Sequence, residues 1–422
     1  MTEDGGAVLA TRAREAGRMP GSDPRGAAEG HWASEVRCHD SALEELAPEW
    51  DDLVARCRTA TPFQYAAWLT AWWRAYGSAG RLRLVLVRRD GRLVAGAAMA
   101  VWHRPYPVLV PIGSGVSDFT DVLLDDTCVD RAAAELAAAL PAHRPWIVAD
   151  LREVRPEGAA QHVVAHWPGW RSRLPDSVCQ HLPALPMEDL LHRLPGRTAQ
   201  RSRVKQRKIA AAGVEVRETP AAEVPDAITA MLQLHALQWR GRGATPEHLN
   251  QRFAQHLREA AAGLVAGGRA CVQEYRLEGE LVAVNVLLLS PGLAGLYMYG
   301  AHPSLRKRLD IAGLLFGESL IRTRHDGVPL LSLLRGTEPY KQRWRPDRDQ
   351  NQRLVLGGGR LAPAAVLHVG AVRLRAAAVR TARARLPWLI TARTRVRELR
   401  GVARSGKAAT GWEPAGRPGS GQ

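Results

Sequence analysis

Apolar positions along residues 36–186 alternate between helical and strand spacing, which predicts an α/β unit. Asp90-Gly91 separates two runs rich in Leu and Val, the pattern of a β-hairpin. Pro48 predicts a kink or a split in the first helix. The predicted elements are, in order, helices over residues 41–56 and 65–77, strands over 81–88 and 92–101, a helix over 131–140 and a strand over 146–151.

A second set of apolar patterns begins near Met187 and ends near residue 357, and it predicts a second α/β unit. Its first long helix carries Arg197, Arg201, Lys205 and Lys208 at spacings of four, four and three residues, so these cations share one face. The predicted elements are helices over 197–212, 224–240 and 246–262, strands over 214–217, 270–276, 281–289 and 293–300, a helix over 311–325 and a strand over 330–334.

Residues 281–305 contain no Asp, Glu, Lys or Arg and are long enough to cross a bilayer. Pro291-Gly292 interrupts this stretch, and the Val residues before it favour a strand. We therefore predict two buried strands joined by a turn.

The two ends of the chain differ in composition from the rest. Residues 1–35 are rich in Gly, Ala and Arg, contain no continuous apolar stretch, and predict a disordered leader and no secretory signal. Residues 358–422 predict an Arg-rich tail that is helical and then disordered; a basic helical stripe there comprises Arg393, Arg397, Arg400 and Arg404. Two interpretations stay open: a solvated helical tail, or an anchor on an anionic surface.

Charge and cysteine content narrow the classes of partner and compartment. The formal net charge of +16 suits a polyphosphate cofactor, a nucleic acid or an acidic membrane surface. The five cysteines are scattered, which argues against a disulfide framework or a zinc site and favours a cytoplasmic protein. The Arg-rich tail adds the inner face of the membrane as a second expected location. The spacing of His, Cys and acidic residues predicts no metal site, and no Ser-His-Asp order indicates a hydrolase.

Two stretches place polar residues directly after predicted strands. Strand 330–334 is followed by a dense polar set that includes Arg335, Glu338 and Lys341, at the end of the strand where α/β folds present a site. Strand 293–300 leads through a bend into Arg306-Lys307-Arg308 and then a helix start. Unpaired amides and the helix dipole at such a start favour a diphosphate. We expect both stretches to face one crevice.

Three segments carry a family resemblance: RTAQRSRVKQRKIAAAGVEV at 197–216, LHALQWRGRG at 234–243, and LYMYGAHPSLRKRLDIAGLLF followed by LLRGTEPYKQRW within 296–344. Together they resemble the CelD/BcsL-type acetyltransferases of the GNAT superfamily, relatives of the FemABX aminoacyl transferases. FQYAAWLTAWWRAYG, VRRDGRLVAG and GVSDFTDVLL match the family more loosely in the first unit. The resemblance implies an α/β (α+β) fold of tandem GNAT-like domains, 36–186 and 187–357, each a mixed, mostly antiparallel sheet flanked by helices.

The resemblance also implies a site for acetyl-CoA or another acyl-CoA as co-substrate. The GNAT phosphate loop has the pattern Gln/Arg-x-x-Gly-x-Gly/Ala, whereas this chain has Arg308-Leu-Asp-Ile-Ala-Gly313, with Ile311 at the middle glycine and Asp310 beside it. We expect the neighbouring cations to compensate by charge. The residues expected at the donor are Tyr299, Arg306, Lys307, Arg308, Ala312 and Gly313.

For the chemistry, an alkyl amine with a pKa of about 10.4 needs a base to become a nucleophile at neutral pH. Glu338 is the first candidate, with Asp118 and His235 as alternatives. Tyr340 is expected to protonate the leaving thiolate and Lys341 to stabilise an oxyanion or a substrate phosphate.

Each of these residues also has a structural interpretation. Glu338 can simply pair with Lys341 or Arg335, His235 can be an ordinary helix-face histidine, and the two acids of the GVSDFTDVLL loop can cap it. On the acceptor side we expect Asp118, Asp121, Trp239 and Arg335.

Three functions remain open. The first is N-acyl transfer to an amine on a sugar, an envelope component or a small metabolite. The second uses an aminoacyl-tRNA donor, with the basic face of residues 197–208 on RNA phosphates. The third is a non-catalytic module that docks to an anionic surface through the basic tail.

Overall fold

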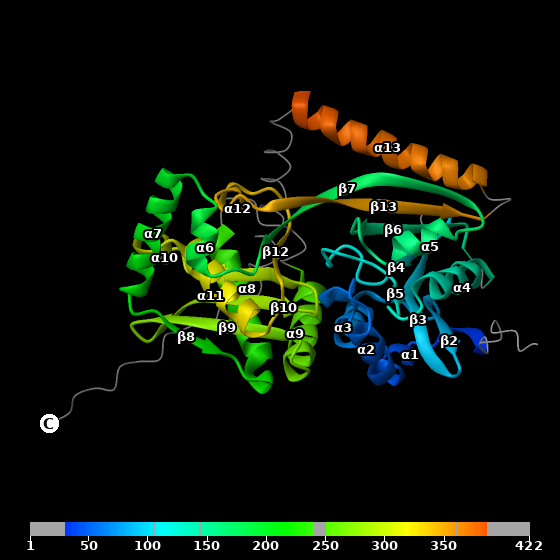
Figure 1. Ribbon diagram of the computed structural model, residues 1–422, viewed down its shortest axis with the longest axis horizontal. Helices are drawn as coiled ribbons and strands as arrows, with labels where there is room; N and C mark the ends of the chain where they lie inside the picture. The colour runs from blue at the N-terminus through cyan, green and yellow to red at the C-terminus, as the bar shows by residue number, and fades with distance from the viewer. Residues whose placement is uncertain (1–29, 104–105, 143–145, 240–249, 359–361, 386–422) are drawn as a thin grey trace, which may run out of the picture.

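The computed structural model of the protein describes residues 30–103, 106–142, 146–239, 250–358 and 362–385. Within these ranges one sheet of 13 strands runs through the molecule in the order β1-β2-β3-β4-β6-β13-β7-β12-β11-β10-β9-β8, with β5 paired to β3. Helices lie along both faces, so the predicted α/β class with a mixed, mostly antiparallel sheet is confirmed (Figure 1).

The N-terminal unit covers residues 32–183. Its elements are β1 (Trp32–Arg37), α1 (Ala42–Glu45), α2 (Ala47–Ala55), a 3-10 turn (Pro62–Gln64), α3 (Ala66–Tyr76), β2 (Leu82–Arg89), β3 (Arg92–His103), β4 (Pro107–Pro111), β5 (Leu123–Leu124), α4 (Val129–Ala142), β6 (Val148–Val154), α5 (Ala160–Ala165) and β7 (Trp170–Pro183).

The C-terminal unit covers residues 187–357 and is followed by one more helix. Its elements are α6 (Met187–His192), α7 (Gly196–Ala210), β8 (Glu215–Glu218), a 3-10 turn (Ala221–Glu223), α8 (Val224–Trp239), α9 (Gln251–Ala266), β9 (Ala270–Leu277), β10 (Glu280–Leu289), β11 (Ala294–Ala301), α10 (Leu305–Arg308), α11 (Ile311–His325), β12 (Leu330–Arg335), α12 (Pro339–Gln342) and β13 (Asp347–Gly357), and the added helix is α13 (Ala362–Arg385).

Several local predictions are confirmed by backbone geometry. The hairpin turns at Asp90 and Gly91, both with positive φ (51° and 81°), the conformation that a type I′ turn requires. Pro48 lies in the first turn of α2 and splits the first predicted helix into two. The apolar segment 281–305 forms the buried strands β10 and β11 instead of a membrane span.

The same order of elements occurs in both units. In the N-terminal unit the hairpin β2–β3 is followed by β4, α4 and β6; in the C-terminal unit β9–β10 is followed by β11, α11 and β12. β4 pairs with β6 in parallel over only two residues, and β11 pairs with β12 in the same way. The strands of each pair then separate, which leaves an opening in each unit.

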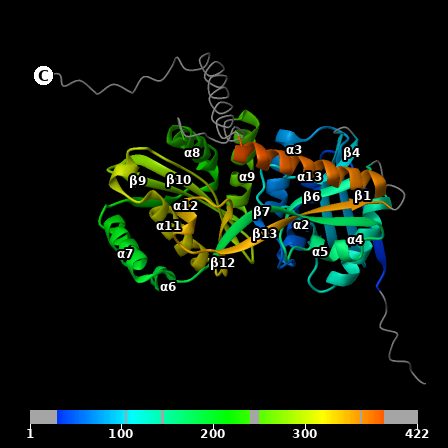
Figure 2. The same cartoon turned by 90° about the horizontal axis from the view of Figure 1, so that it is seen from above.

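The units are joined by an exchange of their last strands. β13 pairs with β6 of the N-terminal unit, β7 pairs with β12 of the C-terminal unit, and β7 and β13 pair with each other along their length. Figures 1 and 2 show these two long strands running between the two groups of elements. The boundaries 36–186 and 187–357 stay a prediction, but the sheet is continuous across them: residues 347–357, which these bounds place in the second unit, pair as β13 with β6 of the first.

The largest hydrophobic cluster also spans both units. It contains Trp50, Trp68 and Trp72 of the N-terminal helices together with Met231 of α8 and Phe253 of α9. Burial of so many large side chains in one cluster favours two units that fold and stay together.

Both ends of the chain differ in part from the prediction. The leader was expected to extend to residue 35, but Trp32–Arg37 is strand β1, paired along its length with β2, because six extended residues complete the edge of the sheet. The helical part of the C-terminal tail is present as α13; the stripe Arg393, Arg397, Arg400 and Arg404 lies outside the described residues, as do residues 1–29 of the leader.

Candidate active site

The opening between β11 and β12 forms a cleft of about 610 Å³. β11 and β12 pair only through Ala294–Leu331 and Gly295–Ser332 and then diverge. Leu334 has a φ of +57° at the register shift of β12 against β7, which turns the end of the strand towards the opening. The polar residues lining the cleft are Asp118, Ser177, His235, Arg335, Glu338 and Lys341.

A second cavity, of about 520 Å³, lies at the N-terminus of α11. Trp239, Tyr299 and Tyr340 line both cavities, so the two are neighbouring parts of one crevice. The prediction that the polar residues after β12 and the bend before α11 share a crevice is confirmed.

Lys341 and Glu338 form an ion pair at the mouth of the cleft. The Lys341 side chain is buried, its Nζ lies 2.9 Å from Glu338 Oε2, and it donates to the Arg335 carbonyl at 2.7 Å. The Glu338 side chain is 46% exposed. The pairing that the sequence offered as a structural role is therefore present, and it holds the Glu338 carboxylate at the edge of the cleft, where a substrate can reach it.

Two tyrosines form the wall between the cavities. Burial raises the pKa of Tyr340, and the neighbouring Tyr299 and Glu338 raise it further. Burial also raises the pKa of Tyr299, which lies beside Gln238. Both phenols therefore keep their protons at neutral pH and can act as hydrogen-bond or proton donors.

His235 reaches the cleft from α8. Its Nδ1 lies 2.9 Å from the Tyr299 carbonyl oxygen, which can only accept, so Nδ1 carries the proton. Burial lowers the pKa of His235, although the Tyr299 carbonyl opposes the shift. The imidazole is neutral at pH 7, and its Nε2 has the lone pair of a base.

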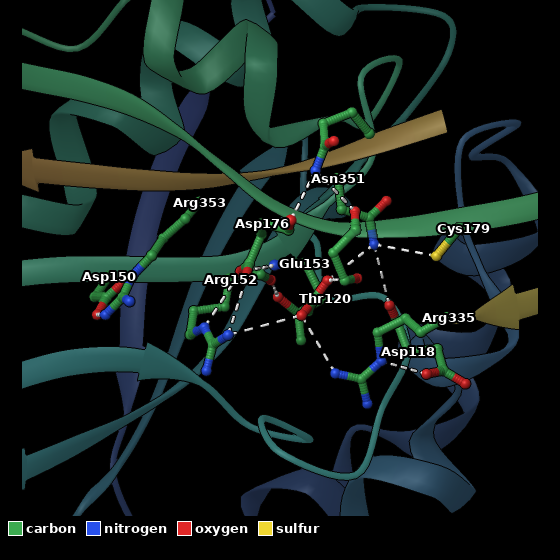
Figure 3. A network of polar contacts seen from close by, with 12 residues as sticks. Asp118, Thr120, Asp150, Arg152, Glu153, Asp176, Cys179, Arg335, Asn351 and Arg353 are labelled. Carbon is green, nitrogen blue, oxygen red and sulfur yellow. Dashed lines mark hydrogen bonds and ion pairs between the residues drawn. The ribbon is translucent and has the colours of Figure 1, made fainter. Parts of the chain in front are cut away.

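A buried polar network joins the units beneath the cleft (Figure 3). Arg335 of β12 donates through Nε to the Asp118 carboxylate and lies 3.3 Å from Glu153 of β6 through Nη1. Asn351 of β13 donates to Glu153 Oε2 at 3.0 Å, and Ser177 of β7 donates to the same oxygen. The strand exchange is thus what brings these side chains to one place.

Within this network Asp118 is mostly buried. Burial raises its pKa, and Arg335 opposes the shift through its charge and its hydrogen bond. Arg335, predicted to contact the acceptor, is held by two carboxylates, so it lines the cleft with its charge already paired. Asp118, one of the alternative bases, is paired in the same way.

Sequence reasoning missed Glu153, Ser177 and Asn351. Glu153 lies in a strand that also holds Asp150 and Arg152, and it has a φ of +56°, which marks the register shift of β6 against β13. Charged residues within a short predicted strand were the only signal available, because the partners of Glu153 come from β7, β12 and β13.

The cavity at α11 is lined by cations from two elements. Lys205 and Lys208 come from α7, and Arg306 and Arg308 from the segment before α11. Arg308 also pairs with Glu278 at 2.6 Å. The side chain of Lys307, predicted at this site, lies outside the described residues.

Asp310 and Ile311 depart from the GNAT loop pattern, and the structure shows how. The Asp310 carboxylate does not cap α11; it pairs with Arg343 at 2.6 Å and Lys205 at 3.3 Å. Ile311 is buried and packs in a cluster with Leu305, Leu309 and Leu314. A branched side chain at this position therefore fills the core, while the first amides of α11 stay at the cavity.

Two predicted site residues have structural positions instead. Asp121, expected on the acceptor side, accepts hydrogen bonds from the backbone of Val122, Ala159 and Ala160 at 2.7–2.9 Å and so holds the start of α5. Burial raises its pKa to about 7. Gly313, expected at the donor, lies in α11 with its α-carbon facing Asp310 and Ile209, whereas Ala312 does line the cavity.

Comparisons with known proteins agree with this geometry. Residues 196–342, 147 of the 422 residues, match the family model described as "Acetyltransferase (GNAT) domain". No curated protein matched the chain. The match begins with α7 and ends with α12. It therefore contains every residue that lines the cavity at α11 and most of the residues that line the cleft.

Solved structures resemble the chain over most of its length at low identity. FemX has a TM-score of 0.56 and 11% identity, covering 73% of this chain and 95% of FemX. A conserved protein of unknown function from Bacteroides thetaiotaomicron has a TM-score of 0.51 and 12% identity, covering 76% and 100%. The C-terminal domain of a protein described as a lysylphosphatidylglycerol synthetase, from Agrobacterium fabrum, has a TM-score of 0.50 and 14% identity, covering 79% and 97%.

At these identities the likeness establishes the fold alone. Two observations bear on the family: residues 196–342 match the family model, and both units repeat one order of elements. Residues 196–342 are therefore similar to a GNAT acetyltransferase domain, and they lie within a fold that repeats one order of elements in two units.

Proposed function

We propose that the protein transfers an acyl group, in the simplest case acetyl, from a CoA thioester to an amine of a sugar, an envelope component or a small metabolite. The observation that supports this most is the shared wall of Trp239, Tyr299 and Tyr340, because it connects a cationic cavity to a cleft with candidate bases. A thioester with a charged diphosphate at one end and a reactive carbonyl at the other needs such a path.

The cationic cavity suits the diphosphate of the donor. Arg306, Arg308 and Lys208 supply positive charge, and the first amides of α11 add donors together with the helix dipole. Asp310 is the one acid in the lining, and its charge is balanced by Arg343 and Lys205. The residues present therefore fit an acyl-CoA, which supplies the activated acyl group.

In the proposed reaction the acceptor nitrogen attacks the thioester carbonyl, the C–N bond forms and the C–S bond breaks. Glu338 accepts the proton that leaves the nitrogen, and Tyr340 donates its proton to the departing sulfur. The Lys341 ammonium has three donors, of which Glu338 and the Arg335 carbonyl engage two, so one remains to stabilise the oxyanion. His235 is the second candidate base.

Binding of acetyl-CoA tests the donor site. At about a hundred times its dissociation constant acetyl-CoA should add about 2.7 kcal/mol to the unfolding free energy, measured by denaturant titration. Acetyl-pantetheine, which lacks the diphosphate, should stabilise far less at the same concentration. Release of free thiol in the presence of a panel of amino sugars and polyamines then reports transfer. A chain that acetyl-CoA does not stabilise would not be a CoA-dependent enzyme.

A second candidate donor is an aminoacyl-tRNA, and one observation favours it. Arg197 and Arg201 on α7 are exposed and form no ion pair with any described residue, and they extend the cation row of Lys205 and Lys208 beyond the cavity. Retention of the protein on tRNA that falls at least tenfold between 50 and 200 mM salt, without stabilisation by acetyl-CoA, would favour this donor.

A further inference from the structure

Helix α13 lies on the outside of the molecule, along the strands that the two units exchange (Figures 1 and 2). Its inner face is buried: Ala365 and Val369 pack in a cluster with Val148 of β6, Leu174 of β7 and Val355 of β13.

A polar anchor fixes the rotation of α13 about its own axis. His368 lies 3.0 Å from Asp150 Oδ2 through Nε2, and its Nδ1 lies 2.7 Å from the Tyr106 hydroxyl. Asp150 is in turn held by the guanidinium of Arg353, whose Nε donates at 2.7 Å. Because one face of the helix is fixed on the sheet, the opposite face must point away from the protein.

The outward face of α13 is apolar. Leu367 is 74% exposed and Leu374 is 73% exposed, which makes them the most exposed large apolar side chains among the described residues. They belong to one stripe at spacings of three and four residues, formed by Pro363, Leu367, Gly370, Ala371, Leu374 and Ala378, all of them exposed. The stripe contains no charged residue over about four turns of helix.

Arginines border this stripe on both sides. Arg373 and Arg380 follow one edge and Arg375 the other, as helical spacing requires, and α13 contains five Arg and no Asp or Glu. An apolar stripe between cationic edges is the pattern of a helix that lies in the plane of an anionic bilayer surface, with its arginines reaching the headgroups.

Other occupants of this face fit less well. A second copy of the chain would oppose its arginines to these arginines, and the basic segment 386–422, with six Arg and one Lys against two Glu, would also be repelled. Residues 362–382 are long and apolar enough to cross a membrane by length and composition. Their inner face, however, is packed on a folded sheet and pinned through His368, which suits a helix lying flat.

We propose that α13 docks the protein on an anionic lipid surface through the stripe of Leu367 and Leu374 and the arginines beside it. This inference is independent of the donor and acceptor chemistry above. The partner is the bilayer surface itself, recognised by its apolar boundary and its negative headgroups.

Co-sedimentation of the full chain with vesicles tests the docking. Binding to phosphatidylcholine vesicles with 30% phosphatidylglycerol should be at least tenfold stronger than binding to pure phosphatidylcholine. Leu374→Glu should weaken binding to the anionic vesicles at least tenfold. Ile321→Glu is the matched control, because Ile321 is 59% exposed on α11 and the change in charge is the same, and it should leave binding within twofold.

A triple variant, Arg373→Gln/Arg375→Gln/Arg380→Gln, keeps the apolar stripe and should lose the preference for anionic vesicles. Equal binding by Leu374→Glu and Ile321→Glu would overturn the proposal, as would a wild-type chain indifferent to phosphatidylglycerol. A concentration-dependent dimer in vesicle-free solution that Leu374→Glu abolishes, without vesicle binding, would assign the face to a second copy. Thermal unfolding of each variant confirms that it is folded.

Discussion

The two units share an order of elements but carry opposite charge at corresponding helix starts. In the C-terminal unit α11 follows Arg306-Lys307-Arg308, whereas in the N-terminal unit α4 follows Asp125-Asp126 and contains Asp130 in its first turn. A helix start favours an anionic ligand, and at α11 Arg306 and Arg308 line a cavity that could receive one, whereas Arg131 in the first turn of α4 pairs with Glu135. The difference favours the start of α11 over the start of α4 as the place of the proposed donor site.

The openings between the parallel strands differ too. In the N-terminal unit the loop after β4 returns to the end of β6, where Thr120 donates its N–H to the Glu153 carbonyl at 3.2 Å and its hydroxyl to the Arg152 carbonyl. The corresponding place in the C-terminal unit is the cleft. The same loop carries Asp118 into that cleft, so the N-terminal unit contributes a side chain to the lining of the cleft in the C-terminal unit.

The strongest test compares two glutamates at equivalent places. Glu338 lies three residues beyond the end of β12 and Glu157 three residues beyond the end of β6, and both side chains are 46% exposed. Glu338→Gln should lower kcat by about 10²- to 10⁴-fold, the range for loss of a general base, while KM for the donor stays within threefold. Steady-state kinetics measure both constants.

Glu157→Gln is the control and should keep wild-type kcat, because Glu157 pairs with Arg155 outside the cleft. If Glu338→Gln turned over normally, His235 would become the candidate base. In that case His235→Gln should lower kcat and remove the acidic limb of the pH profile, where protonation of a general base abolishes activity.

The next test reverses charge at the two helix starts. Arg306→Glu/Lys208→Glu places two acids in the lining of the α11 cavity and should raise the dissociation constant of acetyl-CoA by about 10- to 100-fold, since each charge-assisted contact contributes about 1 kcal/mol or more. Isothermal titration calorimetry measures the constant.

Asp130→Lys makes a comparable change at the start of α4, where the side chain is at the surface, and should leave donor binding unchanged. Tighter donor binding by Asp130→Lys would show that overall charge, and not the α11 cavity, controls affinity, because this variant makes the protein more positive.

A third test addresses the network that joins the units. Asp118→Asn keeps the shape of the side chain but leaves Arg335 with Glu153 as its remaining carboxylate partner. We expect a loss of about 1–3 kcal/mol in unfolding free energy and a fall of about tenfold in kcat, because Arg335 and the neighbouring Lys341 lose their positions. Urea unfolding and kinetics on the same sample separate the two effects. Asp52→Asn is the control: this carboxylate is 56% exposed and pairs with Arg56 and Arg92 away from the network, so its loss should cost less than about 1 kcal/mol.

Elements with strong local signals could be predicted from the sequence. The Asp90-Gly91 turn identified the hairpin, and the cation spacing on residues 197–208 identified α7 to within a few residues. The shared crevice also followed from local rules, because polar groups after a strand and a cationic bend before a helix both point to the ends of a sheet.

Pairing between distant segments could not be predicted. β13 (DRDQNQRLVLG) is polar in its first half, which is largely exposed, and apolar at its end, which is buried, so its periodicity gave no strand signal. The backbone contacts of Asp121 could not be predicted for a similar reason: two of its three amide partners are 38 and 39 residues away, which no local pattern reveals. Side chains that act through such partners need the fold before their roles can be assigned.

The smallest effect concerns the joint between the units, where His256 of α9 meets Trp68 of α3 edge to face at 4.5 Å. His256 is fully buried, and burial lowers its pKa to about 3 from an ordinary 6.5. Between these two values the unfolded chain binds a proton at this histidine and the folded chain does not, so stability falls as pH falls. The resulting loss of stability is about 1 kcal/mol for the pH unit from 6.5 to 5.5, and the effect fades above pH 6.5.

His256→Phe removes the titration and keeps an aromatic ring against Trp68. The unfolding free energy of this variant, from urea titrations at pH 6.5 and 5.5, should therefore change less between these two pH values than that of the wild type, by about 1 kcal/mol. His39→Phe, at an exposed site, should keep the wild-type dependence. Identical slopes for His256→Phe and the wild type would mean that the joint opens to solvent before the rest of the fold, and that the two units are less tightly united than their shared core implies.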